Sequence, residues 1–392
     1  MVYVVKGGFW WIFSKISSSF ISFIIMIAFA HWLPKETYGT YQFVISVLVI
    51  LTIFTLPGLN MSLIKSIGQK REGTLRTTVK EKIKWGLLGS LIALALTCWY
   101  FLKGNNLLAA LFLIVALFTP FKETFRIFVN FWSGRKRFDV QAKYDIASAS
   151  LSAIFLIPTI YLTNDVLIIT AVFLTGQTLF NWLFYFITER QTSNDTPDPE
   201  AITFGKHLTL TQAVIIFSNY IDKIIIWKFL GAAPVAVYSF AQLPIEKIVG
   251  AIPITPLALS KLGEHKIDKK KKKAILSKFL KLFAISVPTT AILVLVAPFL
   301  YKLFFPQYVE SIIYFQVLSG LIALSPCLLL TATLINRMEK KALYFVNAGV
   351  SSVKIILFLI FIPSFGVWGI IAAILIAEIL KTLSALYFFL KI

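Results

Sequence analysis

Ionisable side chains lie within or at the edges of long apolar stretches of this 392-residue sequence. The basic ones are Lys15, Lys122, Arg126, Lys223, Lys228, Lys247, Lys354 and Lys381, and the acidic ones are Glu123, Asp222, Glu246 and Glu378. A charge at the centre of a bilayer costs about 2.5–3.5 kcal/mol on insertion scales, so each is a candidate for function. The surplus is basic, and cations of this kind could replace the hydration shell of an anionic group.

Several of these charges also have a structural interpretation. Lys15 lies near the end of its apolar stretch, where its ammonium group could extend to the membrane surface. Lys228 is interpreted as an anchor at the membrane interface. Lys223 could either pair with groups around Asp222 or reach the outer surface of the membrane.

The remaining charges differ in whether a partner lies at helical spacing. Glu123 with Arg126, and Glu378 with Lys381, are three residues apart and could neutralise each other. Lys122, Lys247 and Lys354 lie deepest, and Lys122 and Lys354 lack an acidic residue three or four positions away. These three are the strongest candidates for binding a ligand.

Hydroxyl and amide side chains share helical faces with the charges. Residues three or four apart lie on one face of a helix. The resulting stripes are Lys15–Ser18–Ser22, Thr119–Lys122–Arg126–Asn130, Thr211–Ser218–Asp222, Ser239–Gln242–Glu246 and Asn347–Ser351–Lys354. Such faces are costly against lipid, so we expect them to line one shared watery interior.

The elements that must position these residues are membrane-spanning helices. The sequence is 58% hydrophobic and 14% charged, which is too apolar for an ordinary soluble domain. A span needs about 20 mostly apolar residues. The expected spans are 9–33, 39–63, 84–102, 106–132, 144–163, 166–189, 207–230, 235–258, 279–304, 309–336, 343–363 and 366–390. Pro120 and Pro326 predict kinks or tilts in the fourth and tenth spans.

Charge alternates between the connections. The sequence has 38 Lys and Arg against 18 Asp and Glu, a formal net charge of +20. Most cations outside the spans fall in the even connections and at the termini, on one side of the membrane, whereas the other side has only Lys35, Lys103 and Lys302. The positive-inside rule therefore places both termini in the cytoplasm. The basic excess is a topology signal, and we expect no nucleic-acid partner.

The sixth connection divides the spans into two sets of six. Residues 192–200 are polar, acidic and proline-bearing, as in a linker. We expect an N-terminal six-helix bundle over residues 1–190, a cytoplasmic linker over 191–206 and a C-terminal six-helix bundle over 207–392. Residues 33–41 align with residues 230–238, which favours a repeat. The expected fold is all-α, with about twelve spans in two pseudo-symmetric bundles around a central cavity.

Several segments resemble one family of transporters. They are residues 8–11, 28–41, 218–223, 229–231, 237–241 and 365–373, the last followed by Glu378. Together they are similar to polysaccharide flippases of the Wzx type, in the multidrug/oligosaccharidyl-lipid/polysaccharide exporter (MOP) superfamily. The resemblance implies a V-shaped pair of bundles around a cationic cavity. It also implies alternating-access transfer of undecaprenyl-diphosphate-linked oligosaccharide across a bacterial or archaeal cytoplasmic membrane.

On this hypothesis the residues take two roles. Lys15, Lys122, Arg126, Lys247 and Lys354 would bind the diphosphate. Asp222, Glu246 and Glu378 would balance charge or couple transport to H⁺, Na⁺ or the membrane potential. We expect a multi-pass membrane protein that acts as a monomer among membrane lipids, with no cofactor.

Three other functions stay open. One is a two-half transporter of the major facilitator type, although the connection between the second and third spans lacks the basic-acidic signature of that type. A cation-coupled multidrug exporter of the same superfamily would have this architecture, although its coupling relies on buried acids. A glycan polymerase or ligase would need a large external loop, and the odd connections are short. Neither cysteines nor histidines fall at metal-ligand spacing, and no nucleotide-binding or protease motif is present, so we expect neither a metal site nor enzymatic activity.

Overall fold

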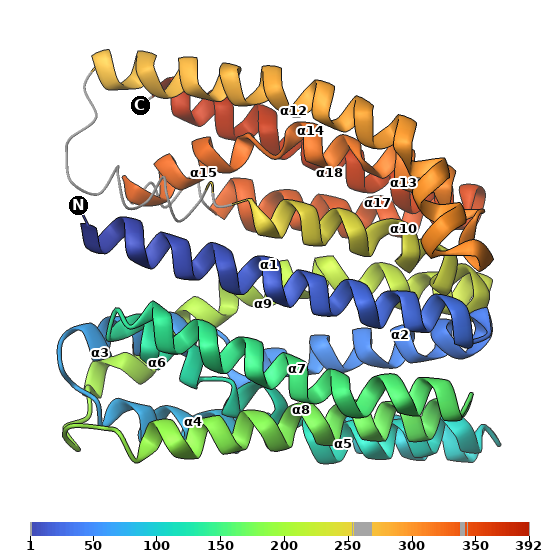
Figure 1. The fold of residues 1–392 in the computed structure, drawn as a ribbon, viewed down its shortest axis with the longest axis horizontal. Helices are drawn as coiled ribbons and strands as arrows, with labels where there is room; N and C mark the ends of the chain where they lie inside the picture. The colour runs from blue at the N-terminus through green and yellow to red at the C-terminus, as the bar shows by residue number, and fades with distance from the viewer. Residues whose placement is uncertain (1, 253, 255–268, 338–341, 343, 392) are drawn as a thin grey trace. The chain divides into compact units, whose positions relative to one another are not determined.

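The computed structural model describes residues 2–252, 254, 269–337, 342 and 344–391. Within them every regular element is a helix, and the long helices of each part lie side by side (Figure 1). Two compact units are distinguished, unit 1 from Met1 to Ile221 and unit 2 from Asp222 to Ile392. The all-helical fold class is confirmed.

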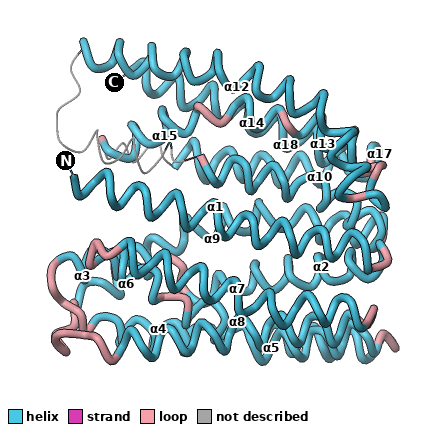
Figure 2. Tube along the Cα trace, in the orientation of Figure 1, coloured by secondary structure: helices cyan, strands magenta, loops and turns pink. Residues whose placement is uncertain are grey.

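Unit 1 contains eight α-helices and the first part of a ninth. Their bounds are α1 (Val2–Trp32), α2 (Lys35–Leu51), α3 (Leu59–Gly68), α4 (Thr74–Leu102), α5 (Asn106–Phe125), α6 (Phe128–Gly134), α7 (Phe138–Leu162), α8 (Val166–Glu189) and α9 (Pro199–Leu230). A 3₁₀ turn, Thr52–Thr55, extends α2. Most of the loops of unit 1 lie near the two ends of its long helices (Figure 2).

Unit 2 contains the end of α9 and the remaining helices. Their bounds are α10 (Ala232–Ala251), α12 (Lys269–Phe304), α13 (Ser311–Leu318), α14 (Gly320–Leu324), α15 (Cys327–Asn336), α17 (Val350–Phe365) and α18 (Val367–Lys391). A 3₁₀ turn, Pro306–Tyr308, follows α12, and a π-helical segment, Tyr344–Gly349, leads into α17. Half of the expected basic connection over 259–278, and part of that over 337–342, lies outside the described residues.

The described helices are long and apolar enough for a multi-pass membrane protein. Nine of them could each cross a bilayer, and Ser311–Leu324 with Cys327–Ile335, which are bent by 45° relative to each other, could together form one more span. The bend lies at Pro326, as the sequence predicts, because proline lacks the N–H that would continue the helix. Two more helices, α9 with 32 residues and α10 with 20, are long enough but carry polar and charged side chains. Twelve segments thus follow one another in the expected order.

The connection between α8 and α9 is the nine-residue segment 190–198, which we call the strap. The helix α9 begins at Pro199, and the two units divide within it, after Ile221. The division of the chain at 191–206 stays a prediction, because the place where two compact units divide does not define where each bundle folds.

One cluster of the apolar core of unit 1 lies where α3, α4, α6 and α8 meet. Phe128, Phe131 and Trp132 from α6 pack with Leu63 and Phe184. The Trp132 Nε1–H donates to Thr188 Oγ1 at 3.0 Å, so the buried indole is satisfied. This core anchors the helix that follows α5, and α5 carries the charges described next.

Candidate functional site

A proline in α5 fixes the approach of α4 to the charged end of α5. Pro120 has no N–H, so the Ala116 carbonyl loses its helical donor. Ser90 of α4 donates to that carbonyl at 2.6 Å. A Cβ at Gly86 would lie 2.9 Å from Pro120 Cα, so only glycine permits this closeness. The next turn of α5 contains Lys122 and Glu123.

The unit 1 cluster consists of Lys82, Lys122, Glu123, Arg126 and Asp145. Lys122 Nζ lies 2.8 Å from Glu123 Oε1, and Arg126 Nη2 lies 2.8 Å from Asp145 Oδ1. Lys82 is buried and donates from Nζ to Asn60 Oδ1 at 3.0 Å. Glu123 also interacts electrostatically with Arg126 and Lys82. Three cations therefore share two carboxylates.

Neighbouring helices fix this cluster. Asn181 of α8 donates from Nδ2 to the Lys122 carbonyl at 3.3 Å, and Ser148 of α7 donates to Asn181 Oδ1 at 2.9 Å. From α1, Ser14 Oγ donates to Asp145 Oδ2 at 3.5 Å. The cluster's residues lie on α4, α5 and α7, and hydrogen bonds join them to Ser14 of α1, Asn181 of α8 and, through Lys82, Asn60 of α3.

The unit 2 cluster is centred on Asp222, at which unit 2 begins. Asp222 Oδ2 accepts bonds from Tyr238 Oη at 2.6 Å and Gln242 Nε2 at 3.2 Å, and Oδ1 accepts from the Lys223 backbone N–H at 2.7 Å. All four residues are buried. A buried carboxylate is tolerated when its oxygens are hydrogen-bonded in this way.

Charges from α9, α10, α17 and α18 complete the unit 2 cluster. Glu246 interacts electrostatically with Lys223, Asp222, Lys247 and Lys354. Lys354 also interacts with Glu378 and Lys381, and Lys381 Nζ lies 3.1 Å from Glu378 Oε1. The cluster contains four cations, Lys223, Lys247, Lys354 and Lys381, against three carboxylates, Asp222, Glu246 and Glu378. The π-helical segment Tyr344–Gly349 lies one turn before Lys354, and π-turns are frequent at functional sites.

The structure thus gathers most of the candidates in two groups. Lys122 and Arg126 lie in unit 1, and Lys247, Lys354, Asp222, Glu246 and Glu378 lie in unit 2. Lys15 has its Nζ 5.9 Å from the Trp11 ring centroid, and its neighbour Ser14 contacts the unit 1 cluster. Their roles in binding and in charge balance stay predictions.

One expected pairing of α5 is wrong and one in α18 is confirmed. Lys122 lacks an acidic residue three or four positions away, as the sequence shows, but its Nζ pairs with the adjacent Glu123. Arg126 forms its ion pair with Asp145 of α7 rather than with Glu123. Glu378 and Lys381 pair as their spacing predicts.

Sequence reasoning missed Asp145 and Lys82 as site residues. The predicted spans begin at 144 and 84, so these two charges were placed at a helix end or in a loop, whereas α7 begins at Phe138 and α4 at Thr74. Both helices begin several residues before their apolar stretches. Lys82 precedes the apolar residues of α4, so hydropathy along the sequence does not indicate that it is buried.

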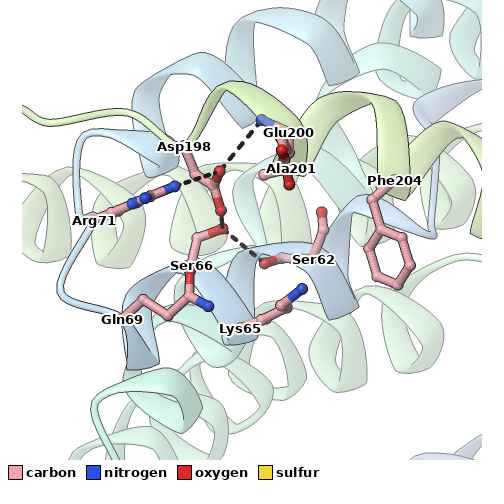
Figure 3. Close-up of a pocket in the computed structure, with 9 residues that line it drawn as sticks. All are labelled: Ser62, Lys65, Ser66, Gln69, Arg71, Asp198, Glu200, Ala201 and Phe204. Atoms are coloured by element: carbon pink, nitrogen blue, oxygen red, sulfur yellow. Dashed lines mark hydrogen bonds and ion pairs between the residues drawn. The ribbon is translucent and has the colours of Figure 1, made fainter.

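A polar pocket of about 260 Å³ lies elsewhere in unit 1, between α3 and the start of α9 (Figure 3). Its lining is Ser62, Lys65, Ser66, Gln69, Arg71, Asp198, Glu200, Ala201 and Phe204. Asp198 accepts bonds from Ser66 Oγ, Arg71 Nη1 and the Glu200 backbone N–H, all within the pocket wall. Burial raises the pKa of Asp198, but these bonds outweigh it and leave that pKa below its ordinary value.

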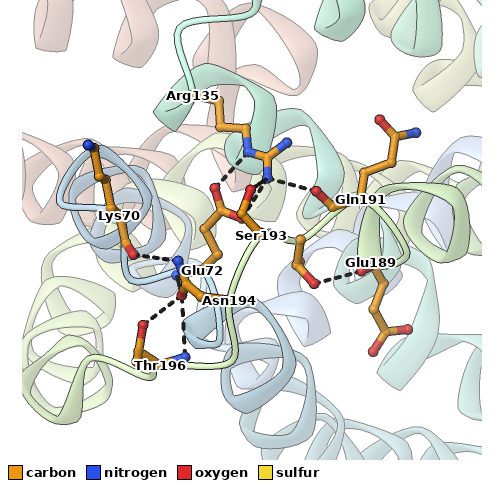
Figure 4. Close-up of polar contacts among 9 residues, drawn as sticks. Lys70, Glu72, Arg135, Glu189, Gln191, Ser193, Asn194 and Thr196 are labelled. Carbon is orange, nitrogen blue, oxygen red and sulfur yellow. Dashed lines mark hydrogen bonds and ion pairs between the residues drawn. The ribbon is translucent and has the colours of Figure 1, made fainter.

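The strap is bonded to the loop between α3 and α4 (Figure 4). Arg135 donates through Nε and Nη2 to the two carboxylate oxygens of Glu72, and through Nη2 to the Gln191 carbonyl and Ser193 Oγ. Asn194 donates to the Lys70 carbonyl at 2.9 Å. Burial raises the pKa of Glu72, yet the hydrogen bonds from Arg135 and Ser193 hold it below its ordinary value. The expected linker is therefore partly a segment that is hydrogen-bonded within unit 1.

The sequence pattern of the family described as polysaccharide biosynthesis protein matches residues 4–253. The chain belongs to this family. The match covers all but the first few residues of unit 1 and the start of unit 2, and so includes the unit 1 cluster and Asp222. No curated protein matches the sequence.

Solved structures share the fold of this polysaccharide biosynthesis protein. The lipid II flippase MurJ in an inward closed conformation has a TM-score of 0.69 at 16% identity, over 99% of this chain and 87% of that one. An inward-facing multidrug resistance MATE transporter of the MOP superfamily has a TM-score of 0.65 at 16% identity, over 97% and 94%. Its outward-facing counterpart has 0.62 at 15%, over 99% and 94%. The fold is that of MOP-superfamily transporters and flippases.

Proposed function

We propose that this protein is a Wzx-type flippase, which moves undecaprenyl-diphosphate-linked oligosaccharide across the cytoplasmic membrane by alternating access. Lys15, Lys122, Arg126, Lys247 and Lys354 bind the diphosphate. Asp222, Glu246 and Glu378 balance the cations or couple transport to H⁺, Na⁺ or the membrane potential. Both termini lie in the cytoplasm, as the distribution of cations predicts.

One observation carries this proposal: among the residues that the structure describes, each unit holds a cluster of charges with one more cation than carboxylate. Cations within apolar helices are expensive, and a set that only stabilised the fold would be neutral overall. The net positive charge of each cluster suits a ligand that brings two or more negative charges. A diphosphate does so, and its oxygens accept the charge-assisted bonds that Lys and Arg donate.

The chemistry also suits a lipid-linked substrate. The prenyl chain can remain in the bilayer while the charged head and its sugars cross, so the protein has to hold only the polar part. The Lys15–Ser18–Ser22 face of α1, whose residues are partly exposed, is suited to sugar hydroxyls. The family's description as polysaccharide biosynthesis proteins supports this substrate class.

A second candidate is a cation-coupled multidrug exporter. The observation that favours it is Asp222, a fully buried carboxylate bonded to Tyr238 and Gln242 in a fold shared with MATE transporters. A drug cation would need carboxylates in excess, whereas both clusters carry an excess of cations. The flippase is therefore the better supported of the two.

The test replaces Lys122 and Lys354 singly by alanine in cells that need the glycan at their surface. We expect each variant to lower surface glycan at least tenfold at matched amounts of membrane-inserted protein. The control is Lys103→Ala, an exposed lysine beside Trp99 at the end of α4. Normal surface glycan in both cluster variants would refute the proposal.

A further inference from the structure

Glu123 and Asp145, the two carboxylates of the unit 1 cluster, differ in how they are held. Glu123 interacts with all three cations of the cluster. Its Oε1 is 2.8 Å from Lys122 Nζ, and it interacts electrostatically with Arg126 and Lys82. The Glu123 side chain is 35% exposed, whereas that of Lys122 is 9% exposed. The Glu123 side chain is thus more exposed than the Lys122 side chain that it neutralises.

Asp145 is held much more firmly. It is buried, and it accepts bonds from two other helices, at Oδ1 from Arg126 and at Oδ2 from Ser14. An anion could replace Asp145 only by breaking contacts between α1, α5 and α7. Glu123 makes its ion pair with its own neighbour on α5, so a change of its side-chain rotamer breaks no ion pair between helices.

Lys82 explains why a carboxylate is needed at this position when no ligand is bound. The lysine is buried in α4, and the described hydrogen bond of its ammonium group goes to a neutral amide, Asn60. A buried cation without a nearby negative charge is strongly destabilising. Glu123 supplies that charge for Lys82 and Lys122 together.

We infer that Glu123 is a resident counter-anion of the unit 1 site, which a diphosphate displaces from Lys122 when it binds. The inference rests on the proposed function and adds a regulatory element to it. In the empty site the carboxylate compensates Lys122 and Lys82. When a diphosphate arrives, its oxygens take over these cations and Glu123 turns toward the open side. Competition by Glu123 lowers the affinity for the anion and so favours its release after translocation.

The test measures binding of farnesyl diphosphate to the purified full-length protein in detergent micelles, by isothermal titration calorimetry. We expect Glu123→Gln to tighten binding about tenfold, because the competing charge is gone while size and shape are kept. Glu36→Gln is the matched control: the same substitution, with the same change in net charge, at an exposed residue in the first turn of α2. It should leave the affinity unchanged.

Two further variants separate the inference from the proposal beneath it. Lys122→Gln should weaken binding at least tenfold, and wild-type affinity in this variant would refute the proposed site itself. If Lys122→Gln weakens binding but Glu123→Gln does not tighten it, the site stands and the displacement inference is wrong. Glu123→Asp, which keeps the charge on a shorter side chain, covers the case in which the glutamine variant does not fold. It should bind between two- and fivefold more tightly than wild type, and an unchanged or weaker affinity would overturn the inference.

Discussion

Arg135 should be the residue that holds the strap onto unit 1. Its guanidinium group bonds both oxygens of Glu72, the Gln191 carbonyl and Ser193 Oγ, and lies over the rings of Phe131 and Trp132. Arg135→Ala removes all of these contacts at once. It leaves the Glu72 carboxylate with a bond from the Ser193 backbone N–H.

The magnitude follows from burial. The Arg135 and Glu72 side chains are 20% and 8% exposed. Removing one partner of a buried ion pair costs about 3–5 kcal/mol, and the partial exposure of Arg135 places the expected loss near 3 kcal/mol. Since about 1.4 kcal/mol corresponds to a factor of ten, the equilibrium for opening the strap should shift about a hundredfold.

The assay is amide hydrogen exchange of the full-length protein in detergent, followed over peptides that cover residues 190–198. Arg135→Ala should speed exchange in this segment about a hundredfold while the core of α5 keeps its protection. The matched control is Arg137→Ala, since Arg137 pairs with Asp139, two residues away, and the two side chains are 56% and 33% exposed. An exposed pair is worth about 0.2–1 kcal/mol, so exchange in the strap should change less than about fivefold. Equal effects of the two substitutions, or unchanged exchange in Arg135→Ala, would refute the reasoning.

Three further predictions concern packing and pH. Gly73→Ala should release the strap and lower the thermal unfolding midpoint, because a Cβ there would lie 2.2 Å from the Asp195 carbonyl oxygen of the strap. A Cβ at Gly250 would meet open space, so Gly250→Ala should not lower that midpoint. Ser90→Ala should destabilise unit 1 by about 1–3 kcal/mol. The substitution leaves the Ala116 carbonyl, which receives no N–H from Pro120, without a hydrogen-bond donor. By contrast, Ser22→Ala removes only a bond within its own helix and should have little effect in the same unfolding measurement. Glu72 has a lowered pKa, so its contribution to strap protection should be constant at neutral pH and should fall only as pH drops below about 4.5, as hydrogen exchange between pH 7 and pH 4 would show after correction for intrinsic rates.

The spans and the bend at Pro326 could be predicted because they depend on local properties of the chain. Hydropathy over about 20 residues determines which segments can cross a bilayer, and a missing N–H determines where a helix breaks. The predicted span 166–189 matches α8 at both ends. In contrast, α4 begins at Thr74, ten residues before the predicted span, since its first turns are polar and lie beyond the apolar stretch.

The partners at the site could not be predicted, because they depend on contacts between helices. Arg126 could reach Glu123 on its own helix, yet it pairs with Asp145, and this choice depends on how α7 packs against α5. Lys82 was interpreted as a loop cation and is buried beside Asn60. The strap has the polar, proline-bearing composition of a linker, and its bonds to Glu72 and Arg135 involve residues that are distant in sequence.

The most direct test of the central claim, that cations of the two clusters bind a diphosphate, is translocation by the purified protein in liposomes. A fluorescent undecaprenyl-diphosphate disaccharide is compared with an analogue whose diphosphate is replaced by a neutral linker. We predict rapid transfer of the diphosphate lipid, at least tenfold slower transfer of the neutral analogue, and little difference between the two lipids in Lys122→Ala and Lys354→Ala. Equal transfer of both lipids by the wild-type protein would contradict the claim.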